Sequence, residues 1–109
     1  MTAEPIHITD EAFEKVVMQS SLPVIVDFWA PWCGPCRAME PVIDDIAGQF
    51  SEKINIFKCN VDDNPISPST YGVKAIPTLI FFKDGQIIEQ ITGMASRAKL
   101  EEIINKIAG

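Results

Sequence analysis

An apolar run over residues 22–30 (LPVIVDFWA) limits the fold more than any other stretch of this sequence. A continuous apolar run bounded by proline is typical of a strand that is covered on both of its faces. The run carries Asp27 and is far shorter than the ~20 apolar residues that a membrane-spanning helix needs. A second β run covers residues 54–61, and a helical pattern lies between the two. Because a strand–helix–strand order requires a crossover, we expect these two strands to form a parallel pair.

Three segments have apolar residues at helical spacing. Thr9 and Asp10, which are capping residue types, precede the first segment, and Ser96 caps the last. The middle segment follows the cysteines, and Pro41 inside it is expected to kink the helix. The apolar faces are Phe13, Val16 and Val17 in the first helix, Met39, Val42, Ile43, Ile46, Ala47 and Phe50 in the second, and Leu100, Ile103, Ile104 and Ile107 in the last.

The segment 76–92 predicts two strands joined at Asp84-Gly85, a dipeptide that strongly favours a hairpin turn. The preceding stretch 64–70 (NPISPST) is expected to be a loop or a short irregular helix. A hairpin is antiparallel, so the sheet that contains both the hairpin and the parallel pair is mixed. We therefore predict an α/β fold, a mixed sheet sandwiched by helices, in a single domain that spans residues 1–109.

The chain is acidic, with a formal net charge of −6. Such a surface repels phosphate backbones and anionic lipids, so neither nucleic acid nor a membrane is an expected partner. Residues 1–5 have neither the basic nor the apolar region of a signal peptide. Three cysteines are an odd number, which no closed set of disulfides explains. We therefore expect a reducing compartment, the cytoplasm, where a stable structural disulfide is unusual.

Cys33 and Cys36 are separated by Gly34 and Pro35 and lie where the first apolar strand ends and the middle helix begins. The pair can be a structural clip, half of a metal site, or two thiols that do chemistry. In a first helical turn, residues three apart have Cβ atoms roughly 5–6 Å apart, whereas a disulfide needs about 3.8 Å. A small local adjustment therefore makes or breaks the bond, and proline is tolerated in such a turn.

The two thiols are expected to differ in reactivity. Cys33, at the entrance of the helix, faces unpaired backbone N–H groups and the positive end of the helix dipole, which favour its thiolate. Cys36 lies one turn further in and should be more enclosed. We therefore predict that Cys33 attacks a disulfide of a partner, and that Cys36 then closes the ring and releases the reduced partner.

Asp27 is the second candidate for chemistry. A carboxylate in an apolar strand is costly to bury in its ionised form, so desolvation should raise its pKa. Lys58, on the next β run, is a plausible charge partner that would lower this pKa again. The structural alternative is a carboxylate satisfied by backbone donors or an ion pair, but its place on the strand that leads to the cysteines favours proton transfer.

Several motifs together resemble the thioredoxin family, in matching order and spacing over nearly the whole chain. They are the segment 29–36 (WAPWCGPC), Asp27, Asn64-Pro65, Ile76-Pro77-Thr78, Asp84-Gly85 and Gly93. Trp29 ahead of the motif makes the chain similar to the bacterial and plastid type. The resemblance implies the thioredoxin fold, a central five-stranded mixed sheet flanked by four helices, and the reduction of disulfides in substrate proteins.

The resemblance also implies the redox partners and the redox group. The group is the Cys33–Cys36 disulfide itself, with no bound cofactor, in a chain expected to be a monomer. A thioredoxin reductase is expected to reduce this disulfide again, with electrons from NADPH or, in photosynthetic systems, from ferredoxin. The location is then the cytoplasm, or the plastid stroma if a transit peptide has been removed.

Individual residues acquire roles from the same resemblance. Cys33 and Cys36 match the redox pair. Asp27 matches the buried group that assists proton transfer at the resolving cysteine, and Lys58 matches the neighbour of that group. Pro77 matches the cis-proline beside the active site, whose preceding backbone pairs with bound substrate. The apolar contact surface around the dithiol is matched by Trp32, Gly34, Pro35, Ile76 and Gly93.

Positions that depart from the commonest family pattern, and so bear on partner preference, are Arg37, Ala75 and Thr92.

Other interpretations of the cysteines remain open. A zinc site needs further ligands, and only Cys59 and His7 remain, neither at a motif spacing. A binding module, in which the dithiol is incidental, keeps the same fold, as does an oxidase or isomerase, against which the Gly-Pro dipeptide argues. Cys59 is expected to be a small buried hydrophobe, the alternative being a secondary redox site. Residues expected to pack or to be solvated, without a chemical role, are His7, Asp44, Asp45, Asp62 and Asp63, whereas for Trp29 packing against the motif and a functional role stay equally open.

Overall fold

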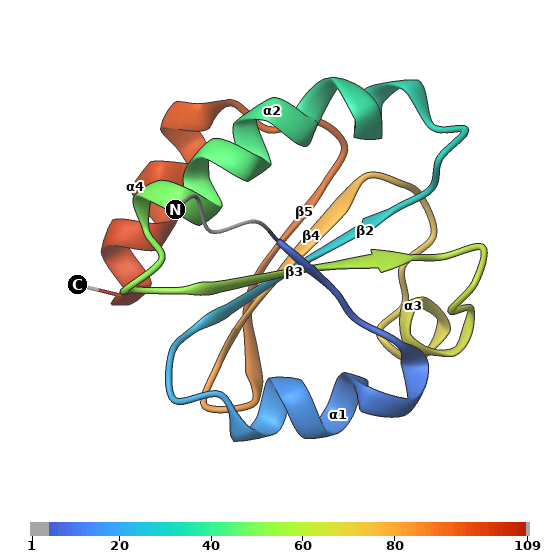
Figure 1. Cartoon of the computed structure of the whole chain (residues 1–109), viewed down its shortest axis with the longest axis horizontal. Helices are drawn as coiled ribbons and strands as arrows, with labels where there is room; N and C mark the ends of the chain where they lie inside the picture. Colours follow the sequence, from blue (N-terminus) through green and yellow to red (C-terminus); the bar gives the residue numbers. More distant parts are fainter. Residues whose placement is uncertain (1–4, 109) are drawn as a thin grey trace.

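The computed structural model describes residues 5–108. Within this range a five-stranded mixed sheet lies between two pairs of helices, so the predicted α/β fold is confirmed (Figure 1). The expectation about a signal peptide rests on the start of the chain, of which residues 1–4 lie outside the described range. The elements are β1 (Ile6–His7), α1 (Asp10–Gln19), β2 (Val24–Trp29), α2 (Gly34–Gln49), β3 (Asn55–Asn60), α3 (Ile66–Thr70), β4 (Thr78–Lys83), β5 (Gln86–Thr92) and α4 (Arg97–Ala108).

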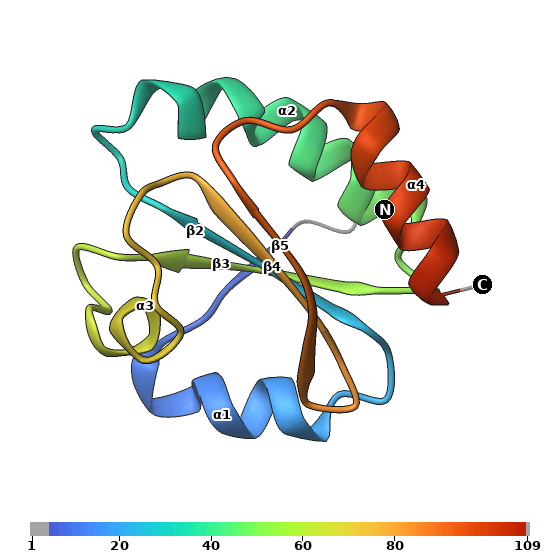
Figure 2. The ribbon, with the colours of Figure 1, turned by 180° about the vertical axis from the view of Figure 1, so that it is seen from behind.

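The helices form two layers, one on each face of the sheet. The helices α2 and α4 cover one face, and α1 and α3 cover the other, as the view from behind also shows (Figure 2). None of the helices within residues 5–108 is both long and apolar enough to cross a membrane. Because helices lie on both faces, the central strands of the sheet are covered on both sides.

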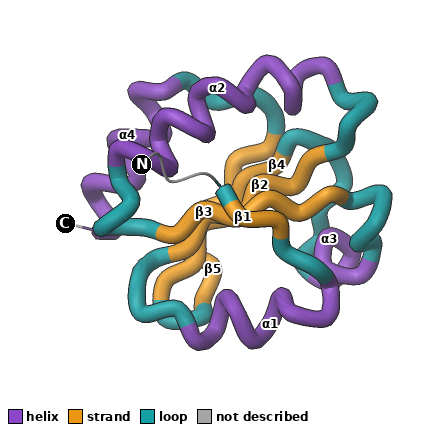
Figure 3. The backbone as a smooth tube through the Cα atoms, viewed as in Figure 1, coloured by secondary structure: helices purple, strands orange, loops and turns teal. Residues whose placement is uncertain are grey.

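The strands lie in the order β1–β3–β2–β4–β5 (Figure 3). As the strand–helix–strand order predicted, β2 and β3 are parallel, and α2 provides the crossover between them. The hairpin of β4 and β5 is antiparallel, and its turn residues Asp84 and Gly85 both have positive φ, 55° and 78°. Two positive φ values are what the tightest hairpin turns require, which explains why the sequence has Asp-Gly at this point.

The side chains of β2 alternate between the two faces of the sheet. Val26 and Phe28 pack in the apolar cluster on the α1 face, whereas Ile25 packs in the cluster beneath α2 and α4. Asp27, two residues after Ile25, therefore lies on the α2 face. Lys58 of β3 is in register with Asp27. The sequence of β2 is thus continuously apolar because helices cover both of its faces. The one carboxylate within the strand, Asp27, lies on the face that α2 covers.

Side-chain caps fix the beginnings of two helices. Thr9 Oγ1 accepts a hydrogen bond of 3.3 Å from the backbone N–H of Ala12, and Ser96 Oγ accepts one of 3.1 Å from the backbone N–H of Lys99. Both caps were predicted. Pro41 lies inside α2, and the kink expected there stays a prediction. The short helix α3 falls in the stretch for which a loop or a short irregular helix was expected.

Cys59 is fully buried in β3 and packs in the same apolar cluster as Phe28 and Ile80. Burial raises the pKa of its thiol to about 12, and the nearby carboxylates of Asp10 and Asp27 add to the rise. The thiolate is therefore suppressed at neutral pH, so the expected burial is confirmed, and the role of Cys59 as a small hydrophobe stays a prediction.

Replacing Cys59 should reveal an apolar environment. We expect Cys59→Ala to lower the free energy of unfolding by about 1 kcal/mol, and Cys59→Ser to lower it by roughly 1–3 kcal/mol more, because a buried hydroxyl without a partner loses its hydration. Urea denaturation followed by circular dichroism measures both variants. Equal stability of the alanine and serine variants would contradict the assignment.

Candidate active site

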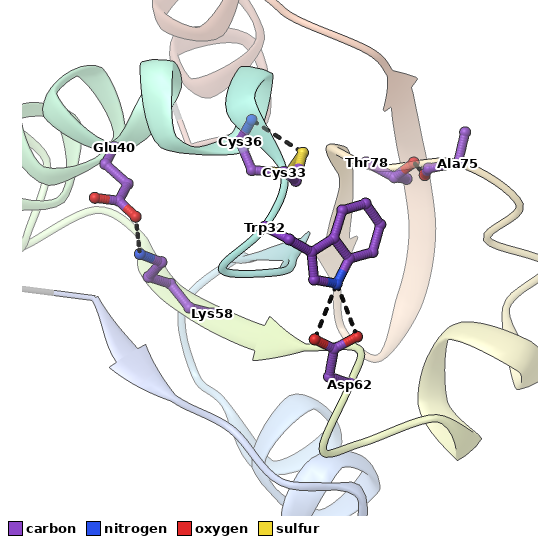
Figure 4. Close-up of a disulfide and its surroundings, with 8 residues drawn as sticks. All are labelled: Trp32, Cys33, Cys36, Glu40, Lys58, Asp62, Ala75 and Thr78. Atoms are coloured by element: carbon purple, nitrogen blue, oxygen red, sulfur yellow. Dashed lines mark hydrogen bonds and ion pairs between the residues drawn. A yellow bond between two sulfur atoms is a disulfide. The ribbon is translucent and has the colours of Figure 1, made fainter.

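A disulfide joins Cys33 and Cys36 at the start of α2 (Figure 4). Cys33 is the N-cap residue of the helix, its Cα lies 5.3 Å from that of Cys36, and its Sγ accepts a hydrogen bond of 3.2 Å from the Cys36 backbone N–H. Gly34 and Pro35 begin the helix, where the missing N–H of proline leaves no helical hydrogen bond unmade. Both cysteines are buried in this oxidised form, 5% and 2% exposed, so Cys36 is more enclosed by a narrow margin.

The first turn of α2 favours negative charge at Cys33. Helix N-termini present unpaired N–H groups and the positive end of the dipole, and the first turn of α2 contains no acidic residue. Arg37 follows directly after the pair and keeps a positive charge in this turn. The surroundings of Cys33 are therefore those in which a cysteine thiolate is stabilised.

The loop before β4 forms the other side of the site. The Ile76–Pro77 peptide bond is cis, and Ile76 packs against the cluster formed by Ala30 and the two cysteines. The Pro77 carbonyl accepts a hydrogen bond of 2.8 Å from the backbone N–H of Gly93, whose φ is 91°. Segments around residues 33, 76 and 93 are thus brought to one rim, as the family resemblance implied.

Trp32 stands exposed beside the disulfide, with 69% of its surface accessible. Its indole N–H donates to both carboxylate oxygens of Asp62, at 3.0 and 3.1 Å (Figure 4). Asp62 is exposed, as predicted, but it also holds the indole ring, which the sequence interpretation missed. Trp32 forms one wall of a groove of about 600 Å³. The other lining residues are Val61, Pro65, Pro68, Ser69, Val73, Lys74, Ala75 and Ile76.

Asp27 is buried on the α2 face of β2, with 4% of its surface exposed. Burial raises its pKa from 3.8 to about 7; the Lys58 ammonium opposes this rise, and the carboxylates of Glu40 and Asp44 add to it. The direction is the one that the sequence predicted, since desolvation exceeds the attraction of Lys58. Asp27 is therefore a carboxyl group that can gain or lose a proton near neutral pH.

Lys58 is close to Asp27 in the sheet, but it forms its ion pair with Glu40. The Lys58 Nζ lies 3.8 Å from Glu40 Oε1 (Figure 4). It also lies 4.4 Å from the centroid of the Trp29 ring. Trp29 in turn lies 5.9 Å from the His7 ring, so the two rings pack together, which was expected for His7 and was one of the two alternatives for Trp29. The contact of Glu40 with Lys58 was not predicted. Its position four residues after Cys36 could have indicated that Glu40 lies on the same side of the helix as that cysteine.

The other aspartates that were expected to be solvated lie at the surface. Asp44 and Asp63 are exposed, as predicted, and the exposed Asp45 pairs with Arg97 at 2.6 Å. Within the described residues, no group of three or more histidine, cysteine, aspartate or glutamate side chains is placed to hold a metal ion. Cys33 and Cys36 are instead joined to each other by a disulfide.

Two sulfurs that form a bond at a helix entrance, next to an exposed apolar rim, can exchange disulfides with other proteins. The fold and the site therefore define a protein thiol–disulfide oxidoreductase. The sequence model of the Thioredoxin family matches residues 4–106, and the chain belongs to the thioredoxin family. The predictions of family, fold and disulfide-reductase activity are confirmed, and the redox group is the disulfide of the chain itself.

Individual relatives agree with this assignment. The chain is 48% identical over 99 residues to Thioredoxin 1 of Synechococcus elongatus, covering 91% of this chain and 92% of that one. It is 45% identical over 104 residues to the chloroplastic M-type thioredoxin of Chlamydomonas reinhardtii, covering 95% and 74%. A solved structure of a mutant thioredoxin from Halobacterium salinarum NRC-1 matches with a TM-score of 0.89 and 32% identity, over 99% of this chain and 94% of that one.

The raised pKa of Asp27 should make stability depend on pH. The pKa is about 7 in the folded protein against an ordinary 3.8, so the folded state favours the protonated acid. Below about pH 4 both states are protonated and ionisation carries no penalty; the penalty grows up to about pH 7 and then stays constant at roughly 4 kcal/mol. We expect Asp27→Asn to be more stable than the parent protein by that order at about pH 8, with the gap closing toward acid pH.

Urea denaturation of the two oxidised proteins at a series of pH values measures this gap. A gap that does not change with pH would contradict a proton bound more tightly by the folded state.

Proposed function

We propose that Cys33 is the nucleophile and Cys36 the resolving thiol in the reduction of protein disulfides. The observation that carries this proposal is the disulfide at the N-terminus of α2, with Cys33 at the cap and Cys36 inside the first turn. The backbone N–H groups of that turn stabilise negative charge at Cys33. The deeper position of Cys36 suits an attack within the chain rather than on a partner.

The reaction proceeds in two exchanges. The Cys33 thiolate attacks one sulfur of a substrate disulfide, forming a mixed disulfide and releasing the other substrate sulfur as a thiolate, which takes a proton. Cys36 then loses its proton and attacks Cys33 Sγ, which forms the Cys33–Cys36 bond and releases the second substrate sulfur. The substrate gains two electrons and the chain loses two, so the sum is one disulfide formed for one reduced.

Asp27 accepts the proton that Cys36 loses in the second exchange. A base is effective when its pKa is near the working pH, and the pKa of Asp27, raised to about 7 by burial, meets this condition. Lys58 supports Asp27 as its neighbour in the sheet register. Both roles follow the family resemblance and rest on the position of Asp27 on the strand that leads to Cys33.

Substrate proteins bind at the apolar rim around the disulfide. Trp32, Ile76 and Gly93 contact the substrate, and the backbone before Pro77 pairs with it. The exposure of Trp32 and the groove beside it support this assignment, because exposed apolar surface marks interaction sites. Gly34 and Pro35 support catalysis by shaping the short ring between the two sulfurs.

The wider setting follows from the family. The chain acts as one domain over residues 1–109 and as a monomer, and it transports electrons from a thioredoxin reductase to its substrates. The reductase takes electrons from NADPH, or from ferredoxin in a photosynthetic organism. The location is the cytoplasm or, by analogy with the chloroplastic relative, the plastid stroma.

Variants of single cysteines test the two roles. Cys36→Ser should accumulate a covalent complex with a disulfide substrate such as insulin, because the resolving thiol is absent, whereas Cys33→Ser should form none and lose at least about 10³-fold in activity. Cys59→Ala should reduce insulin at the parent rate and serves as the matched control. Mass spectrometry of the trapped species identifies the linked cysteine, and a complex through Cys36 would reverse the assignment.

The redox equilibrium tests the direction of electron flow. Against mixtures of reduced and oxidised glutathione, the chain should be half reduced at a potential well below the ~−180 mV of protein disulfide isomerase. Alkylation of free thiols followed by gel shift measures the reduced fraction. Half reduction at or above that potential would indicate an oxidase or isomerase.

A further inference from the structure

One side of α2 carries two carboxylates in the turns that follow the redox pair. Cys36, Glu40 and Asp44 are spaced four residues apart, so they follow one another along one side of the helix. Glu40 is the one that reaches Lys58, with its Oε1 3.8 Å from Nζ (Figure 4). The Lys58 side chain is only 11% exposed, whereas that of Glu40 is 39% exposed. A nearly buried ammonium is thus tied to a carboxylate at the protein surface.

Lys58 is a cation between carboxylates of two different elements. Its backbone is in register with Asp27 across the parallel pair of β2 and β3. Its ammonium nevertheless makes its ion pair with Glu40, and within the described residues it makes none with Asp27. The Trp29 ring, 4.4 Å away, supports the ammonium from β2. One positive charge is therefore shared, and the shorter contact goes to the carboxylate that is not buried.

The charged and titratable groups around Asp27 come from several elements. Lys58 faces it from β3, and α2 brings Glu40, Asp44 and the disulfide-bonded Cys36. The neighbouring β4 contributes the apolar Leu79 in register, and α4 packs into this layer through apolar side chains. Cys59, next to Lys58 on β3, points to the opposite layer. Near Asp27, attraction from one ammonium thus competes with repulsion from two carboxylates.

We propose that Glu40 is a positioning residue, which holds the Lys58 ammonium away from Asp27 and so weakens the attraction between that ammonium and the Asp27 carboxylate. An opposite charge within about 4–6 Å of a carboxylate strongly favours its ionised form. Anchoring the ammonium on Glu40 limits that effect at Asp27. The negative charge of Glu40 itself acts on Asp27 in the same direction. The relevance of this arrangement to turnover rests on the proposed role of Asp27 as proton acceptor.

The test is a titration of the oxidised protein, in which Cys33 and Cys36 carry no titrating thiol. The ¹³C shift of the Asp27 carboxyl group is followed from about pH 4 to about pH 10 in the parent protein and in Glu40→Gln. The neutral amide holds the ammonium less strongly, so we expect the midpoint of Asp27 to fall by roughly 0.5–1 pH unit. Glu14→Gln, which removes an exposed helical glutamate from α1 on the opposite face of the sheet, should leave the midpoint unchanged.

A Lys58→Met background separates the two routes by which Glu40 acts. Without the ammonium only direct repulsion remains, so the shift caused by Glu40→Gln should be clearly smaller than in the parent background. An unchanged or higher midpoint in Glu40→Gln would overturn the proposal, and so would an equal shift in both backgrounds.

The turnover profile then tests the proposed role of Asp27 separately. If Asp27 accepts the proton of Cys36, the pH profile of insulin reduction by Glu40→Gln should move to lower pH together with the Asp27 midpoint. A midpoint that moves while the profile stays in place would support the charge sharing and refute the catalytic role of Asp27.

Discussion

Alternation along β2 puts a single carboxylate, Asp27, beneath α2, while its neighbours Val26 and Phe28 face the α1 layer. The position of Asp27 is fixed by this two-residue period, because the strand is covered on both faces and a shift by one residue would exchange every side chain between the layers. The same strand ends just before the helix that carries the disulfide. Asp27 and the disulfide thus lie on two consecutive elements, β2 and the start of α2.

Burying this carboxylate carries a cost in free energy, because no solvent is present to stabilise its charge. The surroundings offset only part of that cost. Lys58 attracts the charge, but Glu40 and Asp44 repel it, and the pKa stays near 7. A residue selected for stability alone at this position would be apolar, like Ile25 on the same face. A titrating group at this position is what the proposed proton transfer requires.

The elements of the fold could be predicted from local signals that the structure confirms. The apolar run of β2, the Asp-Gly turn and the caps at Thr9 and Ser96 each depend on residues that are close in sequence. The number of strands and the cis bond before Pro77 came from the family resemblance, and the strand order was not predicted, because no local pattern specifies which edge a strand joins or favours the minority isomer.

The site was predictable to the extent that its residues lie in such motifs. The cysteines and Asp27 belong to one continuous segment. The contacts of Glu40 with Lys58 and of Trp32 with Asp62 could not be predicted, because each joins residues 18 to 30 positions apart whose approach depends on how α2 and the loop after β3 lie over the sheet. The rotation of a helix about its axis decides which of its polar side chains reaches a strand below, and the hydrophobic stripe sets it only approximately.

The partition of charge around Lys58 bears on the proton transfer proposed for Asp27. A direct, close ion pair between Lys58 and Asp27 would stabilise the ionised carboxylate and lower its pKa toward that of an ordinary aspartate or below. Such a group is ionised at neutral pH but is a weak base, and it takes little of the proton that a resolving thiol must lose. Without any cation nearby, desolvation would keep the acid protonated and unable to accept. An ammonium paired with Glu40 and still near Asp27 lies between these limits, where the carboxyl group both gives and takes a proton near neutral pH.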